Sequence, residues 1–221
     1  NWLFGRNFDW NSCNGMIVSS LPENGYASIS TVNTDFIRMS GLKLSDLSDA
    51  VQAMICLYAP LDGMNEKGLA VSVNMIQDTA TISQNTDKPD ITTTTAIRLL
   101  LNQAADVGEA VELLKQYDMH ASMGYMMHLA LADRSGRSVA VEYIDNEMVV
   151  IDTPVVTNFY LAEGEKNGIG TSQSHERYDI LMQALADGNA MSMEDVGKAL
   201  DSVSKDNFGE FESTEWSIVV N

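Results

Sequence analysis

The stretch that decides the fold is Leu3-Phe4-Gly5-Arg6-Asn7-Phe8-Asp9, in which a cation and an anion lie three positions apart among aromatic residues. A short run of this composition predicts a strand. Positions three apart in a strand face opposite sides, so a direct ion pair between Arg6 and Asp9 would require a bend or a bulge. Taken alone, the pattern favours a partly buried ion pair over a catalytic role.

Short strand-like runs alternate with turns through the first third of the chain. Strands are expected at 2–10, 15–20 and 26–32, and the Pro22-Glu23-Asn24-Gly25 turn separates the last two, which predicts antiparallel hairpins. Further along, a polar turn rich in glycine precedes the strand 69–74, whose apolar residues alternate. That turn is Asp62-Gly63-Met64-Asn65-Glu66-Lys67-Gly68.

Two pairs of amphipathic helices are predicted in the rest of the chain. In the first pair, one helix is capped by Thr92 or Thr93 and carries an apolar stripe to Ala104, and the next begins at Asp106 with Glu109 completing a capping box. The second pair covers 173–185 and 193–203, the latter introduced by Ser192 and Asp195. Further strands are expected at 125–132, 138–143, 148–151, 155–158 and 215–220, and a surface loop at 78–90.

The order strands, helices, strands, helices, strand favours an α+β protein in which antiparallel sheets carry helices on their outer faces. The strand 125–132 is apolar on both faces, which indicates burial on both sides. No internal repeat or low-complexity linker interrupts the 221 residues, 45% of which are hydrophobic. A chain of this length and composition predicts one domain with one sizeable core.

Composition excludes several classes of function. Acidic residues outnumber basic ones by 31 to 13, and a net charge of -18 argues against nucleic acid and anionic membrane surfaces as partners. Two cysteines, Cys13 and Cys56, are too few for a disulfide framework, and the scattered histidines lack a metal-ligand spacing. We therefore expect no metal and no cofactor. No apolar run is long enough to span a bilayer and no signal region opens the chain, so we expect a soluble protein, either cytoplasmic or secreted.

Four segments occur in an order that resembles the signature segments of the choloylglycine hydrolase family. This family includes conjugated bile acid hydrolases and penicillin V acylases, and related acyltransferases share its fold. The resemblance covers essentially the whole chain and implies a four-layer αββα N-terminal-nucleophile hydrolase sandwich acting on a small-molecule amide. The segments are Leu3-Phe4-Gly5-Arg6-Asn7-Phe8-Asp9, Asp62-Gly63-Met64-Asn65-Glu66-Lys67-Gly68-Leu69, Val156-Thr157-Asn158 and Arg177-Tyr178.

The resemblance also implies roles for five residues. Members of the family use an N-terminal cysteine, freed by processing, whose thiolate attacks the amide, and a nearby cation favours the thiolate. Arg6 matches the residue that supplies this cation, and Asp9 matches the carboxylate that orients the α-amine. Asn74 and Asn158 match the positions that line the oxyanion site, and Arg177 matches the second arginine of the site's charge network. From the residues alone, Asn74 could equally be a strand-end turn residue, and Arg177 a surface cation of a helix.

The chain departs from the family pattern at its nucleophile. An internal Cys13 follows Arg6 and Asp9 and has no free α-amine, whereas the family's cysteine precedes both. We therefore expect a domain of residues 1–221 that is shortened at its N-terminus and also at its C-terminus. Strand and hairpin lengths predict the cysteine on the order of ten residues before Asn1. The alternatives are an acyltransferase of the same fold, a catalytically inactive amide-binding relative, and a hydrolase that uses the Cys13 thiol.

A second departure is the short interval between Asn158 and Arg177. In conjugated bile acid hydrolases this interval holds a long insertion that helps to assemble tetramers and shapes the substrate pocket. The resemblance therefore does not imply a tetramer or a bile acid substrate for this chain. It leaves open whether the chain forms a homo-oligomer.

Overall fold

The computed structural model describes residues 2–39, 41, 43–186, 188, 190–205 and 212–221. Its largest sheet has seven strands in the order β10-β9-β8-β5-β4-β3-β2, and each neighbouring pair is antiparallel. These strands are β2 (Gly15–Ser20), β3 (Ser28–Asn33), β4 (Asp62–Asn65), β5 (Ala70–Met75), β8 (Met127–Ala132), β9 (Ser138–Ile144) and β10 (Glu147–Asp152).

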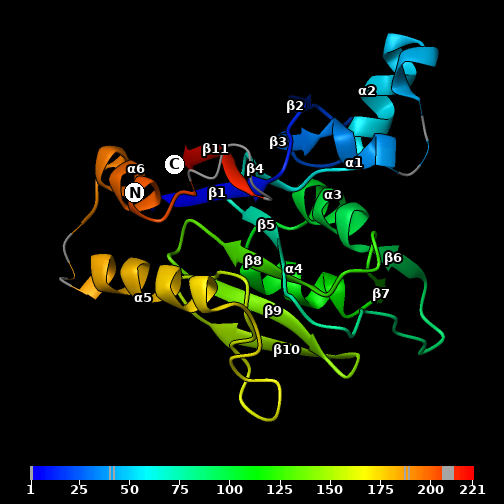
Figure 1. Ribbon diagram of the computed structural model, residues 1–221. Helices are drawn as coiled ribbons and strands as arrows, with labels where there is room; N and C mark the ends of the chain where they lie inside the picture. The colour runs from blue at the N-terminus through cyan, green and yellow to red at the C-terminus, as the bar shows by residue number, and fades with distance from the viewer. Residues whose placement is uncertain (1, 40, 42, 187, 189, 206–211) are drawn as a thin grey trace.

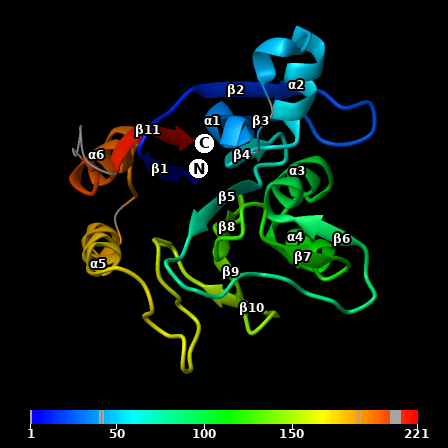
Figure 2. The same ribbon diagram turned by 45° about the vertical axis from the view of Figure 1, so that its right-hand side comes forward.

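A second antiparallel sheet joins the two ends of the chain. It consists of β1 (Phe4–Trp10) and β11 (Ser213–Val220), which lie side by side in Figures 1 and 2. Phe8 stacks on Trp216 across this pair, with ring centroids 4.0 Å apart. Phe8 also belongs to the hydrophobic core that contains Val71 and Val73 of β5, so the small sheet packs on the large one.

Helices cover the outer faces of both sheets. α3 (Thr93–Gln103) packs on β4 and β5, with α4 (Val107–Leu114) beside it. On the opposite side of the molecule, α6 (Met193–Ser202) packs on β1 and β11, and α5 (Ser172–Ala186) contacts α6 (Figure 2). The four layers confirm the predicted α+β arrangement, in which two antiparallel sheets lie between helices.

The helices begin where local capping chemistry predicts. The backbone N–H of Thr92 donates to the Thr95 hydroxyl at the start of α3 (3.0 Å), and Asp106 accepts from the Glu109 N–H at the start of α4 (2.9 Å). The first N–H groups of a helix have no partner within the helix, and these side chains supply one. The Ser192 hydroxyl accepts from the Asp195 N–H in the same way at the start of α6. The stripe on α3 is buried against the sheet at Ala96, Ile97, Leu100 and Leu101.

The prediction of a strand at 155–158 is wrong, because these residues form an irregular segment after Pro154. Its backbone pairs with no strand ladder in the part of the chain that the structure describes, and single polar contacts hold it instead. The Thr157 carbonyl accepts from His128, and the Thr157 hydroxyl donates to the Ser174 carbonyl (3.0 Å). Alternating apolar residues indicate an extended backbone, but they do not show whether a partner strand is available.

Two further parts of the fold differ from the sequence prediction. The helices α1 (Thr34–Met39) and α2 (Asp49–Leu57), with the 3-10 turn Leu44–Asp46 between them, were not expected. They enclose a small separate core around Val32, Ile37, Leu44 and Cys56. The predicted loop 78–90 is irregular up to Pro89, but its end forms β6 (Asp90–Thr92). This strand pairs with β7 (Asp118–His120) in parallel rather than antiparallel orientation.

A buried arginine attaches the unexpected helix α2 to the sheet. The Arg98 side chain donates to the carbonyl of Leu57 at the end of α2 and to the hydroxyls of Ser28 and Ser30 on β3, each at 2.8 Å. Burial lowers the pKa of Arg98. The hydrogen bonds offset part of the cost of burying this charge, and they link α2, α3 and β3 at one point.

The segment 62–68, predicted as a turn, forms strand β4 over residues 62–65 before the chain turns, and this strand is attached to α3. A Cβ atom on Gly63 would lie 2.6 Å from the Ile29 carbonyl oxygen and 2.8 Å from the Leu101 side chain, so only glycine allows this close approach. Asn65 then donates to the carbonyls of Leu101 (3.0 Å) and Ala104 (2.8 Å) at the end of α3. Its Oδ1 accepts from the backbone N–H groups of the turn at Lys67 and Leu69.

We predict that Asn65→Ala lowers the free energy of unfolding by about 2–4 kcal/mol, because it removes four hydrogen bonds and leaves carbonyls at the end of α3 without a partner. Urea unfolding of the variant and the wild type measures the difference. Asn24→Ala, in an exposed turn, is the matched control and should change stability by less than about 0.5 kcal/mol. Equal effects of the two substitutions would contradict the assigned role of Asn65.

Candidate active site

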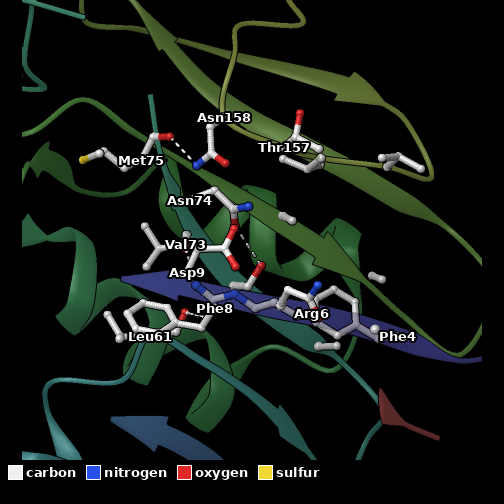
Figure 3. A pocket seen from close by; sticks show the side chains of 18 of the residues that line it. Phe4, Arg6, Phe8, Asp9, Leu61, Val73, Asn74, Met75, Thr157 and Asn158 are labelled. Carbon is white, nitrogen blue, oxygen red and sulfur yellow. Dashed lines mark hydrogen bonds between the residues drawn. The ribbon is translucent and has the colours of Figure 1, made fainter. Parts of the chain in front are cut away.

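A cleft of about 1310 Å³ is lined by β1, β5, β8, α5 and the irregular segment 154–158. Figure 3 shows its interior, where side chains from strand and loop face the same space. All five residues that the resemblance singles out line this one cleft, although they come from positions spread over most of the chain. They are Arg6, Asp9, Asn74, Asn158 and Arg177.

Arg6 is buried, and its guanidinium connects the two sheets. Nη1 donates to the Leu61 carbonyl (2.9 Å) and forms an ion pair with the fully buried carboxylate of Asp62 at the start of β4. Nη2 donates to the Val73 carbonyl on β5 (2.8 Å). The guanidinium also lies 5.5 Å from the centre of the Phe8 ring. Nε is buried and has no hydrogen-bond partner among the described residues.

The ion pair between Arg6 and Asp9 that the pattern favoured is not formed. The required bulge does exist, because Phe8 lies opposite Trp216 whereas Asp9 lies opposite Thr214. Asp9 pairs instead with Arg177 (Oδ2 to Nη1, 3.3 Å), and it accepts from the Thr214 hydroxyl (2.6 Å). Arg6 forms its ion pair with Asp62, which lies 56 positions away in the sequence. A local sequence pattern does not reveal a partner at that separation.

Arg177 joins Asp9 to Asn158 across the cleft. Its Nη2 donates to Asn158 Oδ1 (3.0 Å), and Asn158 Nδ2 uses one of its two hydrogens to donate to the Met75 carbonyl (2.7 Å). The Arg177 side chain is only 16% exposed, so the reading as a surface cation of a helix is wrong. The loop residue Asn158 is thereby held against the end of β5, as Figure 3 shows.

Asn74 lies on β5, inside the strand rather than in a turn beyond it. Its Oδ1 accepts from the Ser72 hydroxyl (3.3 Å), and its Nδ2 donates no hydrogen bond to any part of the chain that the structure describes. In Figure 3 the Asn74 side chain appears between Asn158 and Asp9. Asn74 and Asn158 therefore each have at least one side-chain N–H free to donate into the cleft.

The sequence reasoning missed several polar residues that shape the site. Asp62 was assigned only to a turn, and Thr214 lies just before the expected strand 215–220. His128 and Glu142 escaped notice because each lies within an apolar strand, on β8 and β9. An ionisable residue inside a run that is otherwise apolar was the available signal, since such residues are rarely buried without a partner.

Neither cysteine has the environment of an activated thiol. Cys13 and Cys56 both lie in the described part of the chain, and neither lines the cleft. Burial raises the pKa of the Cys13 thiol, and the nearby charges of Glu215 and Asp35 raise it further. Burial also raises the pKa of Cys56. A nucleophilic thiol requires the opposite shift, so the structure gives no support to a hydrolase that uses Cys13.

The short interval between Asn158 and Arg177 is anchored at the edge of the cleft. Lys166 forms an ion pair with Asp78 (2.7 Å), and the Tyr160 hydroxyl donates to the same carboxylate (2.9 Å). The hydrogen bond from Lys166 lowers the pKa of Asp78 to about 2. Asp78 lines the cleft, so these contacts fix the loop 159–170 at its rim.

Within the described ranges, no group of three or more histidine, cysteine, aspartate or glutamate residues is placed to hold a metal ion. Over the same residues, no helix has the length and apolar character needed to cross a bilayer.

We predict that Asp62→Asn lowers the free energy of unfolding by about 3–5 kcal/mol, because the buried Arg6 charge loses its counterion. Glu112→Gln, which breaks an exposed pair with Lys115 on the surface, is the matched control and should cost less than about 1 kcal/mol. Urea unfolding of both variants decides the question. A loss for Asp62→Asn as small as that of the control would show that Arg6 is not held in the way described.

Comparison with known proteins shows the family to which the chain belongs. A model of the linear amide C-N hydrolases, choloylglycine hydrolase family, matches residues 1–159. The chain is also 31% identical over 99 residues to a penicillin V acylase from Pectobacterium atrosepticum. That alignment covers 40% of this chain and only 26% of the acylase.

Solved structures share the fold over 99% of this chain. A mutant conjugated bile acid hydrolase from Clostridium perfringens matches with a TM-score of 0.72 at 18% identity, and 82% of that chain is covered. Penicillin V acylase from Agrobacterium tumefaciens matches with a TM-score of 0.66 at 20% identity over 75% of its chain. These matches confirm the predicted N-terminal-nucleophile hydrolase fold. With the family model matching most of the sequence, the chain belongs to the choloylglycine hydrolase family of linear amide C-N hydrolases.

Proposed function

We propose that the protein hydrolyses a linear amide with the thiolate of a cysteine that lies outside residues 1–221. The observation that carries this proposal is the buried, unpaired Nε of Arg6, a residue that lines the cleft. A buried donor without a partner is costly, and a thiolate next to it would accept its hydrogen bond and be stabilised by its charge. The two cysteines of the chain itself lie elsewhere.

In this proposal each cleft residue has one task. The thiol proton passes to the α-amine of the cysteine, which Asp9 orients, and the sulfur attacks the amide carbonyl carbon. The resulting oxyanion accepts hydrogen bonds from the side-chain amides of Asn74 and Asn158. The α-amine then gives its proton to the leaving nitrogen, and water hydrolyses the thioester. Arg177 holds Asp9 and Asn158 in place relative to each other, because it donates one hydrogen bond to each of them.

The cleft also supports a substrate class. Much of its lining is apolar and aromatic, which favours an amide whose acyl group is bulky and apolar. The lining includes Leu3, Phe4, Trp10, Phe36, Met64 and Met127. Penicillin V acylase and conjugated bile acid hydrolase, two proteins that resemble this chain, are both named for small-molecule substrates. We therefore propose a small N-acyl amide as the substrate.

A panel of amides tests the proposed reaction on the complete protein. It should contain glycine- and taurine-conjugated bile acids, phenoxymethylpenicillin, N-acyl amino acids and acyl homoserine lactones, with product analysis by mass spectrometry. Release of free acid and free amine supports hydrolysis. Transfer of the acyl group to a second amine or alcohol would identify an acyltransferase, and binding without turnover an inactive relative. Either of these outcomes contradicts the proposal.

We predict that Asn74→Ala and Asn158→Ala in the complete enzyme each lower kcat by about 10²–10³-fold with little change in KM. An oxyanion donor acts mainly in the transition state, so its removal spares substrate binding. Steady-state kinetics on the best substrate of the panel measure both constants, with Asn24→Ala as the unaffected control. Loss of binding with an unchanged kcat would assign the two asparagines to substrate recognition instead.

A further inference from the structure

Behind the cleft, a histidine and a glutamate form a fully buried pair. His128 on β8 and Glu142 on β9 have side chains that are 0% exposed, with Nδ1 and Oε1 3.1 Å apart. Both lie in strands that are otherwise almost entirely apolar. Buried ionisable groups persist only when paired and hydrogen-bonded, so the contacts of these two residues account for their presence.

The pair holds the segment that carries Asn158. His128 Nε2 lies 2.7 Å from the Thr157 carbonyl oxygen. Glu142 accepts from the backbone N–H groups of Leu161 (2.8 Å) and Ala162 (3.0 Å). The segment 157–162 is therefore fixed at three points by two side chains, and the first of these points is the peptide group that joins Thr157 to Asn158.

Hydrogen-bonding capacity determines one hydrogen of the pair. A carbonyl oxygen can only accept, so His128 Nε2 carries a hydrogen and donates it to the Thr157 carbonyl. Burial alone would raise the pKa of Glu142, but hydrogen bonds from His128, Leu161 and Ala162 hold this pKa below its usual value. The His128 ring therefore links the Thr157 carbonyl to a carboxylate that is itself held by two backbone N–H groups.

Single polar contacts rather than a strand ladder hold Asn158. No strand pairs with the segment 155–158 in the part of the chain that the structure describes. The Thr157 hydroxyl donates to the Ser174 carbonyl, and the Asn158 side chain is held by Arg177 and by the Met75 carbonyl. Asn74, in contrast, lies on β5 directly opposite His128 on β8. The histidine therefore has a fixed strand position beside one predicted oxyanion donor, and its ring reaches the backbone next to the other.

We propose that His128 and Glu142 are positioning residues, which together set the place of Asn158 relative to Asn74. This inference rests on the proposed function of the two asparagines. The alternative is a pair that stabilises the fold and has no influence on the reaction. The two readings differ in what happens to kcat when the protein stays folded.

Replacement of the histidine in the complete protein tests the proposal. His128→Gln can still donate a hydrogen bond, but it replaces the ring that links the Thr157 carbonyl to Glu142, and it thereby shifts the support under Asn158. We expect kcat to fall by about 10- to 100-fold, less than for deletion of the donor itself, and KM to stay within about threefold. The control is His120→Gln, because His120 pairs with Asp90 at the same 3.1 Å distance on the surface, and it should leave both constants unchanged.

Two outcomes separate this inference from the proposed function. If Asn158→Ala lowers kcat whereas folded His128→Gln does not, the positioning role is overturned and the proposed function stands. If neither Asn74→Ala nor Asn158→Ala affects kcat, the proposed function fails. The positioning role then fails as well, because Asn158 would not be an oxyanion donor that needs to be positioned.

Nuclear magnetic resonance gives a readout that does not depend on activity or on a variant of His128. In the complete, ¹⁵N-labelled protein, Nε2 of His128 should resonate as a protonated nitrogen, because it donates to the Thr157 carbonyl. Spectra of His120→Gln and His175→Gln assign the remaining histidine signals. An unprotonated Nε2 in His128 would show that the ring does not hold the Thr157 carbonyl, and it would overturn the positioning role.

Discussion

The buried guanidinium of Arg6 is the constraint on which the rest of the site depends. It enters from the two-stranded sheet and is held by Asp62 and by the carbonyls of Leu61 and Val73, all of which belong to the β4–β5 region of the large sheet. Burying a charge is costly unless a counterion and hydrogen bonds offset the cost. Because these partners lie on the large sheet and Arg6 lies on the small one, the contacts fix the distance between the two sheets. Of the guanidinium nitrogens, Nε alone has no hydrogen-bond partner among the described residues. A further group that accepts a hydrogen bond from Nε would complete the contacts of Arg6.

Two kinds of support place the groups around this cation. Asp9 and Asn74 lie on strands, where ladder hydrogen bonds set their positions. Asn158 lies on an irregular segment and depends on polar contacts, from Arg177 on one side and from the His128–Glu142 pair beneath. The Asp78–Lys166 ion pair fixes the continuation of the same segment at the rim of the cleft. Ladder hydrogen bonds therefore hold the strand side of the cleft, and polar contacts between side chains and backbone hold its loop side.

The sequence predicted those parts of the structure that local chemistry determines. Helix caps such as Asp106 and Ser192, and the alternation of apolar residues in β5, depend on only a few neighbouring residues. The order of the helices and strands predicted from such signals led to the correct arrangement of layers. The partner of Arg6 lies 56 positions away, and the missing ladder at 155–158 reflects the absence of a neighbouring strand. Both are tertiary facts that no short pattern contains. The resemblance to a family supplied the candidate residues, and the fold brought all of them to one cleft.

The central claim is that a thiol outside residues 1–221 completes the cleft at Arg6. Alkylation of the complete, mature protein with iodoacetamide, followed by peptide mass spectrometry and an amide hydrolysis assay, tests it most directly. The account predicts that inactivation follows the labelling of one cysteine, which is the mature N-terminal residue and precedes Asn1. Inactivation that follows labelling of Cys13 or Cys56 would contradict the account, and so would a mature protein that begins with another residue and still hydrolyses amides.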